Sequence, residues 1–334
     1  MANRREKGFV MSFSFGLLLI SLLILSPSVY SQQSQDINDL LQVGSNMIRQ
    51  GDYKQAIELF DKLLELNPKI IPALLQRGVA HGQIGDYDKA IADFTSVIKI
   101  DSADTDAHYS LAMAYDRSGD NNNAITEYSR VIRLNPDYYK AFINRGLIYY
   151  NNNEFDKAVD DFVEAANIKP DYARIFFNLG RSYEAKKNLE LAVENYSRAV
   201  ELDPNYTDSY YNRGNVYYSL DKYDEAIADF LKIIDIDDNY ADSYFGLAAT
   251  YEWLQRYDEA AEAYANYVRT ALPSDSTRIE TATLKIDDVM RKKQRLIEGG
   301  GEEFAPPDST KSRINPFLMP ATKPRDTLKT TGDK

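Results

Sequence analysis

The sequence predicts an all-α fold built from antiparallel helix pairs, and three observations carry this prediction. Alanine recurs every 34 residues without insertion or deletion, at Ala56, Ala90, Ala124, Ala158, Ala192, Ala226 and Ala260. An aromatic residue follows each alanine four positions later, one helical turn away. A proline closes four of the periods. A constant period of this length is typical of stacked repeats that present a long inner surface for binding.

The alanine, counted as position 20, divides residues 37–274 into seven units. These units are 37–70, 71–104, 105–138, 139–172, 173–206, 207–240 and 241–274. In each unit a first helix is expected over about positions 1–14, a turn at positions 15–17, and a second helix to about position 31, where proline stops it. Small residues at positions 8 and 20 allow the two helices to approach closely, and the aromatic residue at position 24 fills the flank.

A second period of two repeats lies inside the first. Even repeats carry Arg at position 7 and Asp at position 23, whereas odd repeats have an apolar residue at position 7 and no Asp at position 23. Because an arginine fork can meet a carboxylate at two points, this joint occurrence predicts ion pairs between the two helices of each even repeat. The predicted pairs are Arg77–Asp93, Arg145–Asp161 and Arg213–Asp229.

The N-terminal residues follow the order of a secretory signal peptide. Basic residues between positions 4 and 7 precede an apolar run over 9–25, and Val29 and Ser31 stand before a polar segment. We therefore expect a signal peptide over 1–31, cleaved after Ser31, and a linker over 32–36. The alternative is an uncleaved membrane anchor, although a spanning helix needs about 20 apolar residues. Export would place the protein in the periplasm or outside the cell.

The residues after the seventh unit predict one more helix and a tail. Thr277 and Glu280 have the spacing of a capping box at a helix start. An apolar stripe follows, formed by Ile279, Ala282, Ile286, Val289, Met290 and Ile297. A helix over 275–298 is therefore expected to cap the last apolar face of the stack. The proline-containing segment 299–334 is expected to be a disordered tail.

Composition and motifs argue against several classes of function. The formal net charge of −12 disfavours non-specific binding to nucleic acid. The absence of cysteine excludes disulfides and thiolate metal sites. No phosphate-binding glycine loop, zinc-protease motif or nucleophile elbow is found, and His81 and His108 fall at packing positions of the repeat. We therefore expect neither an enzyme nor a cofactor.

These features resemble the tetratricopeptide repeat family. Tyr211–Tyr218 (YNRGNVYY), followed by Tyr223–Phe230 (YDEAIADF), matches the family pattern closely, and the resemblance covers residues 37–274. It implies a right-handed superhelix of seven 34-residue antiparallel helix pairs, to which the C-terminal capping helix is added. It also implies that a protein or peptide partner is held in the concave groove.

In that family the first helix of each pair lines the groove, mainly through positions 2, 5, 9, 12 and 13, with position 6 nearby. Carried onto this chain, these positions give aromatic, asparagine and basic candidates for partner binding. They are Tyr109, Lys140, Asn144, Tyr150, Arg174, Phe177, Asn178, Arg181, Tyr211, Asn212, Tyr218, Phe245 and Trp253. Aromatic side chains serve as rigid anchors, and the three consecutive asparagines offer amides to a peptide backbone. The alternative for each is packing within the repeat.

Charges along the expected groove are unevenly distributed. The basic ones, in repeats four and five, are Lys140, Arg174 and Arg181, and the acidic ones, in repeats six and seven, are Asp208, Asp242 and Glu252. A ligand with an acidic stretch leading into a basic one would fit this order, and the alternative is solvated charges without a partner.

The sequence therefore favours a non-enzymatic exported scaffold or adaptor that binds protein segments. The alternative is a glycan-associated repeat protein of a polysaccharide export or envelope assembly system. The partner and the oligomeric state are not indicated by the sequence, and contact with a membrane is expected only if the N-terminal segment is uncleaved.

Overall fold

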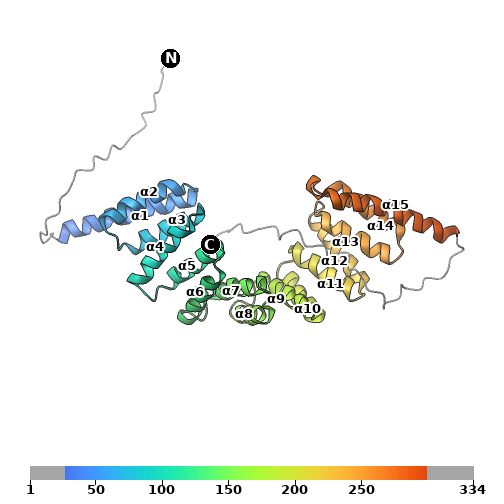
Figure 1. Cartoon of the computed structure of the whole chain (residues 1–334), viewed down its shortest axis with the longest axis horizontal. Helices are drawn as coiled ribbons and strands as arrows, with labels where there is room; N and C mark the ends of the chain where they lie inside the picture. Colours follow the sequence, from blue (N-terminus) through green and yellow to red (C-terminus); the bar gives the residue numbers. More distant parts are fainter. Residues whose placement is uncertain (1–26, 299–334) are drawn as a thin grey trace, which may run out of the picture. The chain divides into compact units, whose positions relative to one another are not determined.

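The computed structural model describes residues 27–298, which form α-helices joined by short turns and one 3₁₀ turn, with no β-strand in that range (Figure 1). The helices are α1 (Pro27–Gln50), α2 (Tyr53–Leu66), α3 (Ile71–Gln83), α4 (Tyr87–Ile100), α5 (Thr105–Ser118), α6 (Asn121–Leu134), α7 (Tyr139–Asn151), α8 (Phe155–Ile168), α9 (Ala173–Ala185), α10 (Leu189–Leu202), α11 (Thr207–Ser219), α12 (Tyr223–Ile236), α13 (Ala241–Trp253), α14 (Tyr257–Thr270), η1 (Pro273–Asp275) and α15 (Ser276–Glu298). The all-α prediction is confirmed.

The chain divides into two compact units, one ending at Ser102 and the other beginning at Ala103. Unit 1 contains α1–α4, and unit 2 contains α5–α15. Within each unit the helices pack in successive pairs, and the second helix of a pair also packs against the first helix of the next. The handedness of a superhelix and the number of repeats stay predictions.

The close helix crossing inside each pair has the predicted steric cause. All seven alanines at position 20 are completely buried. The aromatic ring at position 24 lies directly over the glycine at position 8, because a Cβ atom built on Gly78 would lie 2.7 Å from the Phe94 ring, and one on Gly180 would lie 2.6 Å from Tyr196. At these glycines an added Cβ atom would require the ring to move, whereas the third and seventh repeats accommodate the small side chains of Ala112 and Ala248 at position 8.

The N-terminal boundary differs from the expected one. Helix α1 begins at Pro27, so the segment 32–36, expected to be a linker, is helical. Pro27 stands at the first helical position, where its missing N–H costs little, and no glycine or proline interrupts the helix before Gly44. The expected cleavage point after Ser31 therefore lies within α1, and most of the expected signal peptide, residues 1–26, lies outside the described residues.

The C-terminal helix also differs in detail. Helix α15 packs against α14 and buries Ala282 and Val289 completely. It starts at Ser276, directly after η1, so the expected capping box at Thr277 is wrong: Thr277 already lies inside the helix. Met290 and Ile297 were expected on the packed face but are 43% and 64% exposed. The expected tail, 299–334, lies outside the described residues.

Two further findings concern the described range as a whole. His81 and His108 are buried, in agreement with their expected packing role. Among the helices between residues 27 and 298, none combines the length and the apolar character that crossing a membrane requires.

The turn inside each pair requires a left-handed backbone at position 15. Glycine supplies it three times, at Gly51, Gly85 and Gly119, where φ lies between 82° and 87°. The other four repeats use residues with a side chain, namely Asn153, Lys187, Asp221 and Gln255, with φ between 58° and 62°. Left-handed geometry costs about 1–2 kcal/mol for a residue with a Cβ atom, and less for Asn or Asp. These four turns therefore hold backbone strain.

Replacing Lys187 or Gln255 by glycine is expected to relieve this strain and raise the unfolding free energy by about 1 kcal/mol each. The control is Gly85→Ala, because a Cβ atom there would meet no atom within 4 Å and only backbone strain would change. It should lower stability by a similar amount. Urea unfolding of the full chain measures both; a loss of stability in both glycine variants would contradict the interpretation.

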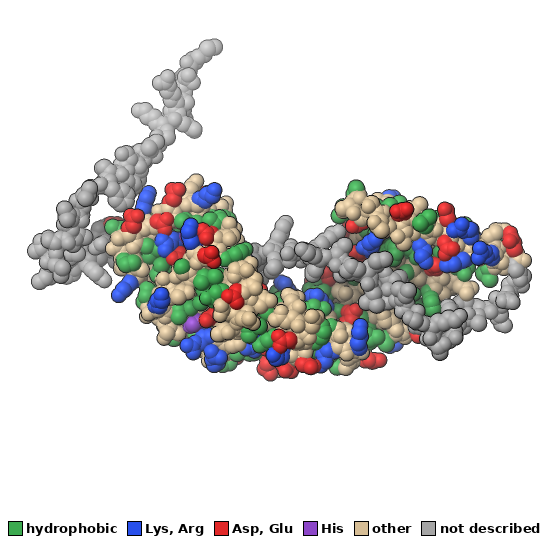
Figure 2. All heavy atoms as spheres, viewed as in Figure 1, with side chains coloured by type: hydrophobic (Ala, Val, Ile, Leu, Met, Phe, Trp, Pro, Cys, Tyr) green, Lys and Arg blue, Asp and Glu red, His purple; other side chains and the backbone are tan. Residues whose placement is uncertain are grey.

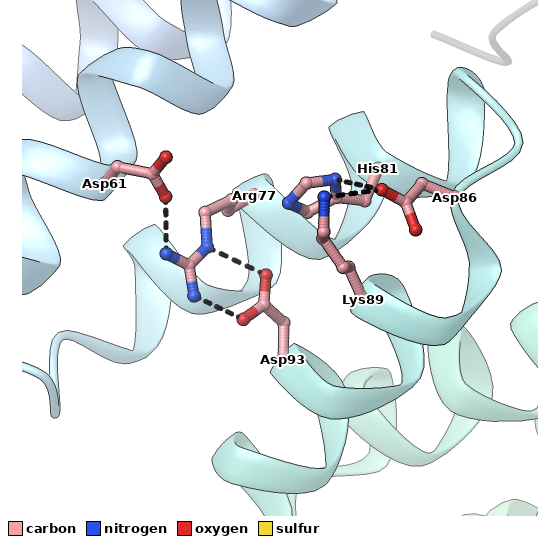
Figure 3. Close-up of polar contacts among 6 residues, drawn as sticks. All are labelled: Asp61, Arg77, His81, Asp86, Lys89 and Asp93. Carbon is pink, nitrogen blue, oxygen red and sulfur yellow. Dashed lines mark hydrogen bonds and ion pairs between the residues drawn. The ribbon is translucent and has the colours of Figure 1, made fainter.

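The three predicted Arg–Asp pairs are present and bidentate. Nε and Nη2 of Arg77 donate to the two carboxylate oxygens of Asp93 at 2.9 and 2.6 Å (Figure 3). Arg145–Asp161 and Arg213–Asp229 show the same two hydrogen bonds within 0.1 Å. The aspartates are nearly buried, with 4–5% of their surface exposed. Each pair joins the two helices of one even repeat, so the sequence prediction is confirmed.

Each of these arginines also reaches the preceding odd repeat, which the sequence analysis missed. Nη1 of Arg77 donates to Asp61, at position 25 of the first repeat (Figure 3). Arg145 and Arg213 donate in the same way to Ser129 and Ser197. The signal was present in the sequence: position 25 is Asp or Ser in these odd repeats but Thr95, Val163 and Leu231 in the even ones. The arginine therefore ties two repeats into a double unit.

Arg213→Leu is expected to destabilise the chain by about 3–5 kcal/mol, because Asp229 is left charged and unpaired in a buried place. The double change Arg213→Leu with Asp229→Ala should recover much of this loss, since Leu247 and Ala263 fill the same positions in the seventh repeat.

The measurement is the unfolding free energy in urea, with Arg198→Leu as the control because its pair with Glu201 is exposed and contributes about 1 kcal/mol or less. A double variant as unstable as the single one would show that the buried charge is not the cause.

Candidate partner-binding surface

All the candidate binding residues lie on first helices of unit 2. Their places are Tyr109 on α5, Lys140, Asn144 and Tyr150 on α7, Arg174, Phe177, Asn178 and Arg181 on α9, Tyr211, Asn212 and Tyr218 on α11, and Phe245 and Trp253 on α13. Helix α7 contacts α9, α9 contacts α11, and α11 contacts α13, so most of these residues lie on helices that are next to one another. We call this set the first-helix face. Whether a partner binds it stays a prediction.

The aromatic residues at position 5 pack into a regular ladder. The ring of Tyr109 lies 4.9 Å from Tyr138, and that of Phe177 lies 5.0 Å from Tyr206. The aromatic residues at position 5 stay partly exposed, and each ring also contacts the buried aromatic at position 24, as Phe177 does with Tyr196 at 6.0 Å. The tyrosine at position 34 was missed, although its period is visible in Tyr138, Tyr172, Tyr206 and Tyr240.

The aromatic candidates at positions 12 and 13 are less uniform. Tyr150 packs edge-on to Phe155, with 5.4 Å between ring centroids, and stays partly exposed. Tyr218 is 9% exposed and packs against Tyr223, which also neighbours Trp253 at 6.2 Å. Tyr218 therefore has little surface to offer a partner, whereas Tyr150 and Trp253 keep some.

The three asparagines at position 6 have three different environments. Nδ2 of Asn144 donates to the hydroxyls of Tyr109 and Tyr128 at 3.0 and 3.2 Å. Asn212 donates to the carbonyl oxygen of Asp208 in its own helix. Asn178 is 3% exposed, and its Nδ2 has no hydrogen-bond partner among the described residues.

The repeat register explains the unpaired amide of Asn178. One repeat after Tyr109 and Tyr128, the two corresponding residues are Ile143 and Phe162, which carry no hydroxyl. Because Asn144 is already bonded and Asn178 is buried, these two amides do not form an open row for a peptide backbone.

The basic candidates on α9 lie among aromatic rings. The guanidinium of Arg181 lies 4.5 Å from the centre of the Tyr150 ring and 5.7 Å from that of Phe177. Within residues 27–298, neither Arg174 nor Arg181 forms an ion pair or a side-chain hydrogen bond. Glu184, one turn after Arg181, instead accepts a hydrogen bond from the Tyr196 hydroxyl at 2.8 Å, and burial raises the pKa of its carboxyl.

The acidic candidates of the seventh repeat are already paired within the chain. Arg278 of α15 contacts Asp242 at 2.8 Å and lies over the Phe245 ring at 5.4 Å. Lys285 and Lys292 donate to Glu252, at 3.1 and 2.7 Å. Figure 2 shows Lys and Arg side chains gathered with Asp and Glu over α15. Two of the three expected acidic groups, Asp242 and Glu252, are therefore paired with the capping helix, whereas Asp208 of the sixth repeat accepts a hydrogen bond from the Tyr240 hydroxyl and forms no ion pair among the described residues.

The described residues offer no site for a metal ion. No group of three or more His, Asp or Glu side chains between residues 27 and 298 is arranged to hold a metal. The buried carboxylates named above are already paired with arginine, lysine or tyrosine side chains. The first-helix face offers a ligand aromatic rings, charged groups and hydrogen-bonding groups.

The contacts of Lys285 and Lys292 with Glu252 predict how the stability of the fold depends on pH. Burial raises the pKa of Glu252, but Lys292 and Lys285 outweigh it, and the net pKa is lowered from 4.5. A lowered folded-state pKa contributes stability that is present above about pH 4.5 and lost as the pH falls through the folded value. Glu252→Gln should cost about 2 kcal/mol at neutral pH.

This cost should shrink as the pH falls below the lowered pKa of Glu252 in the folded chain, because the carboxyl is then protonated in both folded and unfolded chains. Unfolding free energies of both proteins across this range test it, with the exposed Glu262→Gln as the control. A cost that does not change with pH would exclude the charge of Glu252 as its source.

Similarities to solved structures support the fold. The C-terminal part of a TPR repeat-containing protein from Cytophaga hutchinsonii is 19% identical, with a TM-score of 0.62 over 72% of this chain and 98% of that one. A tetratricopeptide repeat protein from Parabacteroides merdae is 17% identical, with a TM-score of 0.54 over 77% and 99%. YrrB, described as a TPR protein with an unusual peptide-binding site, is 22% identical, with a TM-score of 0.50 over 57% and 97%.

Family models match the chain in successive segments, while the comparison with curated proteins gave no match. Models described as "Tetratricopeptide repeat" match residues 39–70, 71–104, 207–240 and 242–270. A model described as "TPR repeat" matches 114–153, 146–187 and 180–221. Together these matches span most of residues 39–270, and the chain belongs to the tetratricopeptide repeat family.

Proposed function

We propose that this protein is a non-enzymatic exported scaffold that binds segments of partner proteins on the first-helix face of unit 2. The carrying observation is the ladder of partly exposed aromatic residues at position 5: Tyr109, Phe177, Tyr211 and Phe245. Each ring contacts two neighbouring rings, as in Tyr211, which lies 6.1 Å from Phe230 and 5.9 Å from Tyr240. Aromatic side chains held in place lose little entropy on binding and dominate interface energetics.

The likeness to YrrB supports the same function, because that protein is described as having a peptide-binding site. Export is supported by the order of basic, apolar and small residues over 1–31, which lies mostly outside the described residues. Mass spectrometry of the exported protein tests this part of the proposal: a mature chain that begins near residue 32 agrees with it, and an intact Met1 contradicts it.

Site-specific photo-crosslinking tests partner binding. A photoreactive phenylalanine analogue replaces Tyr211 on the first-helix face or, as the control, the exposed Glu194 on α10. After irradiation in the native compartment, we expect a discrete protein adduct from position 211 and none from position 194. Equal labelling at both positions, or a polysaccharide adduct at 211, would refute protein binding on this face.

A further inference from the structure

The first-helix face carries two arginines on α9 that form no ion pair within the described chain. We propose that Arg174 and Arg181 bind an acidic segment of the partner, each arginine pairing with one carboxylate of a segment that runs along α9. This inference rests on the proposed function and specifies the chemistry of the partner.

The two arginines lie on the same side of α9. They are seven residues apart, which is two helical turns, so their Cα atoms are about 10 Å apart along the helix axis. Positions 2 and 9 of the fifth repeat are both groove positions in this family, and both side chains are partly exposed. One ligand segment can therefore reach both.

Arg181 is oriented before any ligand arrives. Its guanidinium lies over the Tyr150 ring, 4.5 Å from the ring centre, and 5.7 Å from the centre of the Phe177 ring. A guanidinium over an aromatic ring can still offer N–H groups at its edge for a bidentate contact with a carboxylate. The aromatic support reduces the side-chain entropy that such a contact would otherwise cost.

Arg174 and Arg181 both act electrostatically on one tyrosine, Tyr206. Burial raises the pKa of the Tyr206 hydroxyl, Asp208 raises it further, and both arginines lower it, so both guanidinium groups lie within electrostatic reach of this hydroxyl. Lys140, at position 2 of the preceding repeat, is exposed on the neighbouring helix α7.

The acidic groups nearby form no ion pair with the two arginines. Asp208 accepts a hydrogen bond from the Tyr240 hydroxyl at 3.3 Å, and Glu184 accepts one from Tyr196. Burial raises the pKa of Glu184, which disfavours its ionised form. Neither carboxylate lies in ion-pair contact with an arginine of α9 within the described part of the chain.

Charge elsewhere on the face favours the same ligand. The sequence suggested a partner with an acidic and a basic stretch, but Asp242 and Glu252 are paired with α15, so Asp208 alone of the three expected acidic groups has no ion pair among the described residues. In a chain with a net charge of −12, the arginines of α9 then form a local basic site in an acidic protein. Their spacing of about 10 Å is close to that of carboxylates three residues apart in a polyproline II segment, which advances about 3.1 Å per residue and returns to the same side every third residue. The expected motif is an acidic residue, two others and a second acidic residue.

Fluorescence anisotropy with short labelled peptides tests this inference on the full chain. One peptide carries Asp at two places three residues apart in a Gly/Ser background, and its partner carries Lys at the same places. We expect the Asp peptide to bind at low ionic strength, the Lys peptide not to bind, and the affinity for the Asp peptide to fall as salt is added. Absence of Asp-peptide binding, or equal binding of both peptides, overturns the proposal.

Two sets of variants locate the site. Arg174→Gln with Arg181→Gln should weaken Asp-peptide binding at least tenfold, whereas the control, Arg133→Gln with Arg198→Gln on second helices, removes the same charge and should leave it unchanged. Arg174→Glu with Arg181→Glu should transfer binding to the Lys peptide, a gain that loss of folding cannot produce. Equal weakening in the Gln variant and the control would assign binding to net charge and overturn the proposal.

The crosslink at position 211 separates this inference from the proposed function. If the adduct persists at full yield when both arginines are replaced by Gln, the face binds a protein but the acidic-segment inference fails. If the adduct is absent already with both arginines present, the proposed function fails. An adduct that requires the arginines, with a crosslinked peptide containing the expected acidic spacing, supports both.

Discussion

The contact between position 8 and position 24 is the constraint on which the rest of the fold depends. A glycine such as Gly180 lets the first helix lie against the ring of Tyr196, and Ala192 lets the second helix approach from the other side. Because the ring is completely buried between the helices, a residue larger than alanine at position 8 would push them apart. The separation of the helices in turn decides which side chains can meet across the pair.

Alternate repeats use that fixed separation in two ways. In even repeats an arginine crosses between the helices to a buried aspartate and also reaches the preceding repeat, as Arg213 does with Asp229 and Ser197. In the fifth and seventh repeats the hydroxyl of the buried tyrosine bonds a carboxylate of the first helix, as Tyr264 does with Glu252 at 2.9 Å. The polar cross-link therefore changes partner from one repeat to the next, while the helix spacing stays the same.

The sequence predicted the periodic part of this structure because periodic residues meet the same neighbours in every repeat. Arg77 and Asp93 could be paired from their joint occurrence alone, yet the bond to Asp61 required knowing which face of the preceding repeat lies beside Arg77. The contact of Lys292 with Glu252 was not predictable, because α15 lies outside the repeats. The side of α15 that faces the stack is set by the burial of Ala282 and Val289. Asn178 fits neither case: its residue type repeats, but the hydroxyls that satisfy Asn144 do not recur beside it.

The capping helix changes what the surface can recognise as well as how the stack ends. By pairing Asp242 and Glu252, α15 covers the last repeat with charge as well as with apolar side chains, and both acids stop being available to a partner. The charges that stay unpaired on α9 are the ones that neither repeat packing nor the cap uses. Arg181 rests on Tyr150, a residue whose counterpart two repeats later, Tyr218, is nearly buried. We therefore expect a partner protein to be recognised where the repeats differ. The side chains concerned are placed by the repeated helix pairs but have no ion-pair partner within the described chain.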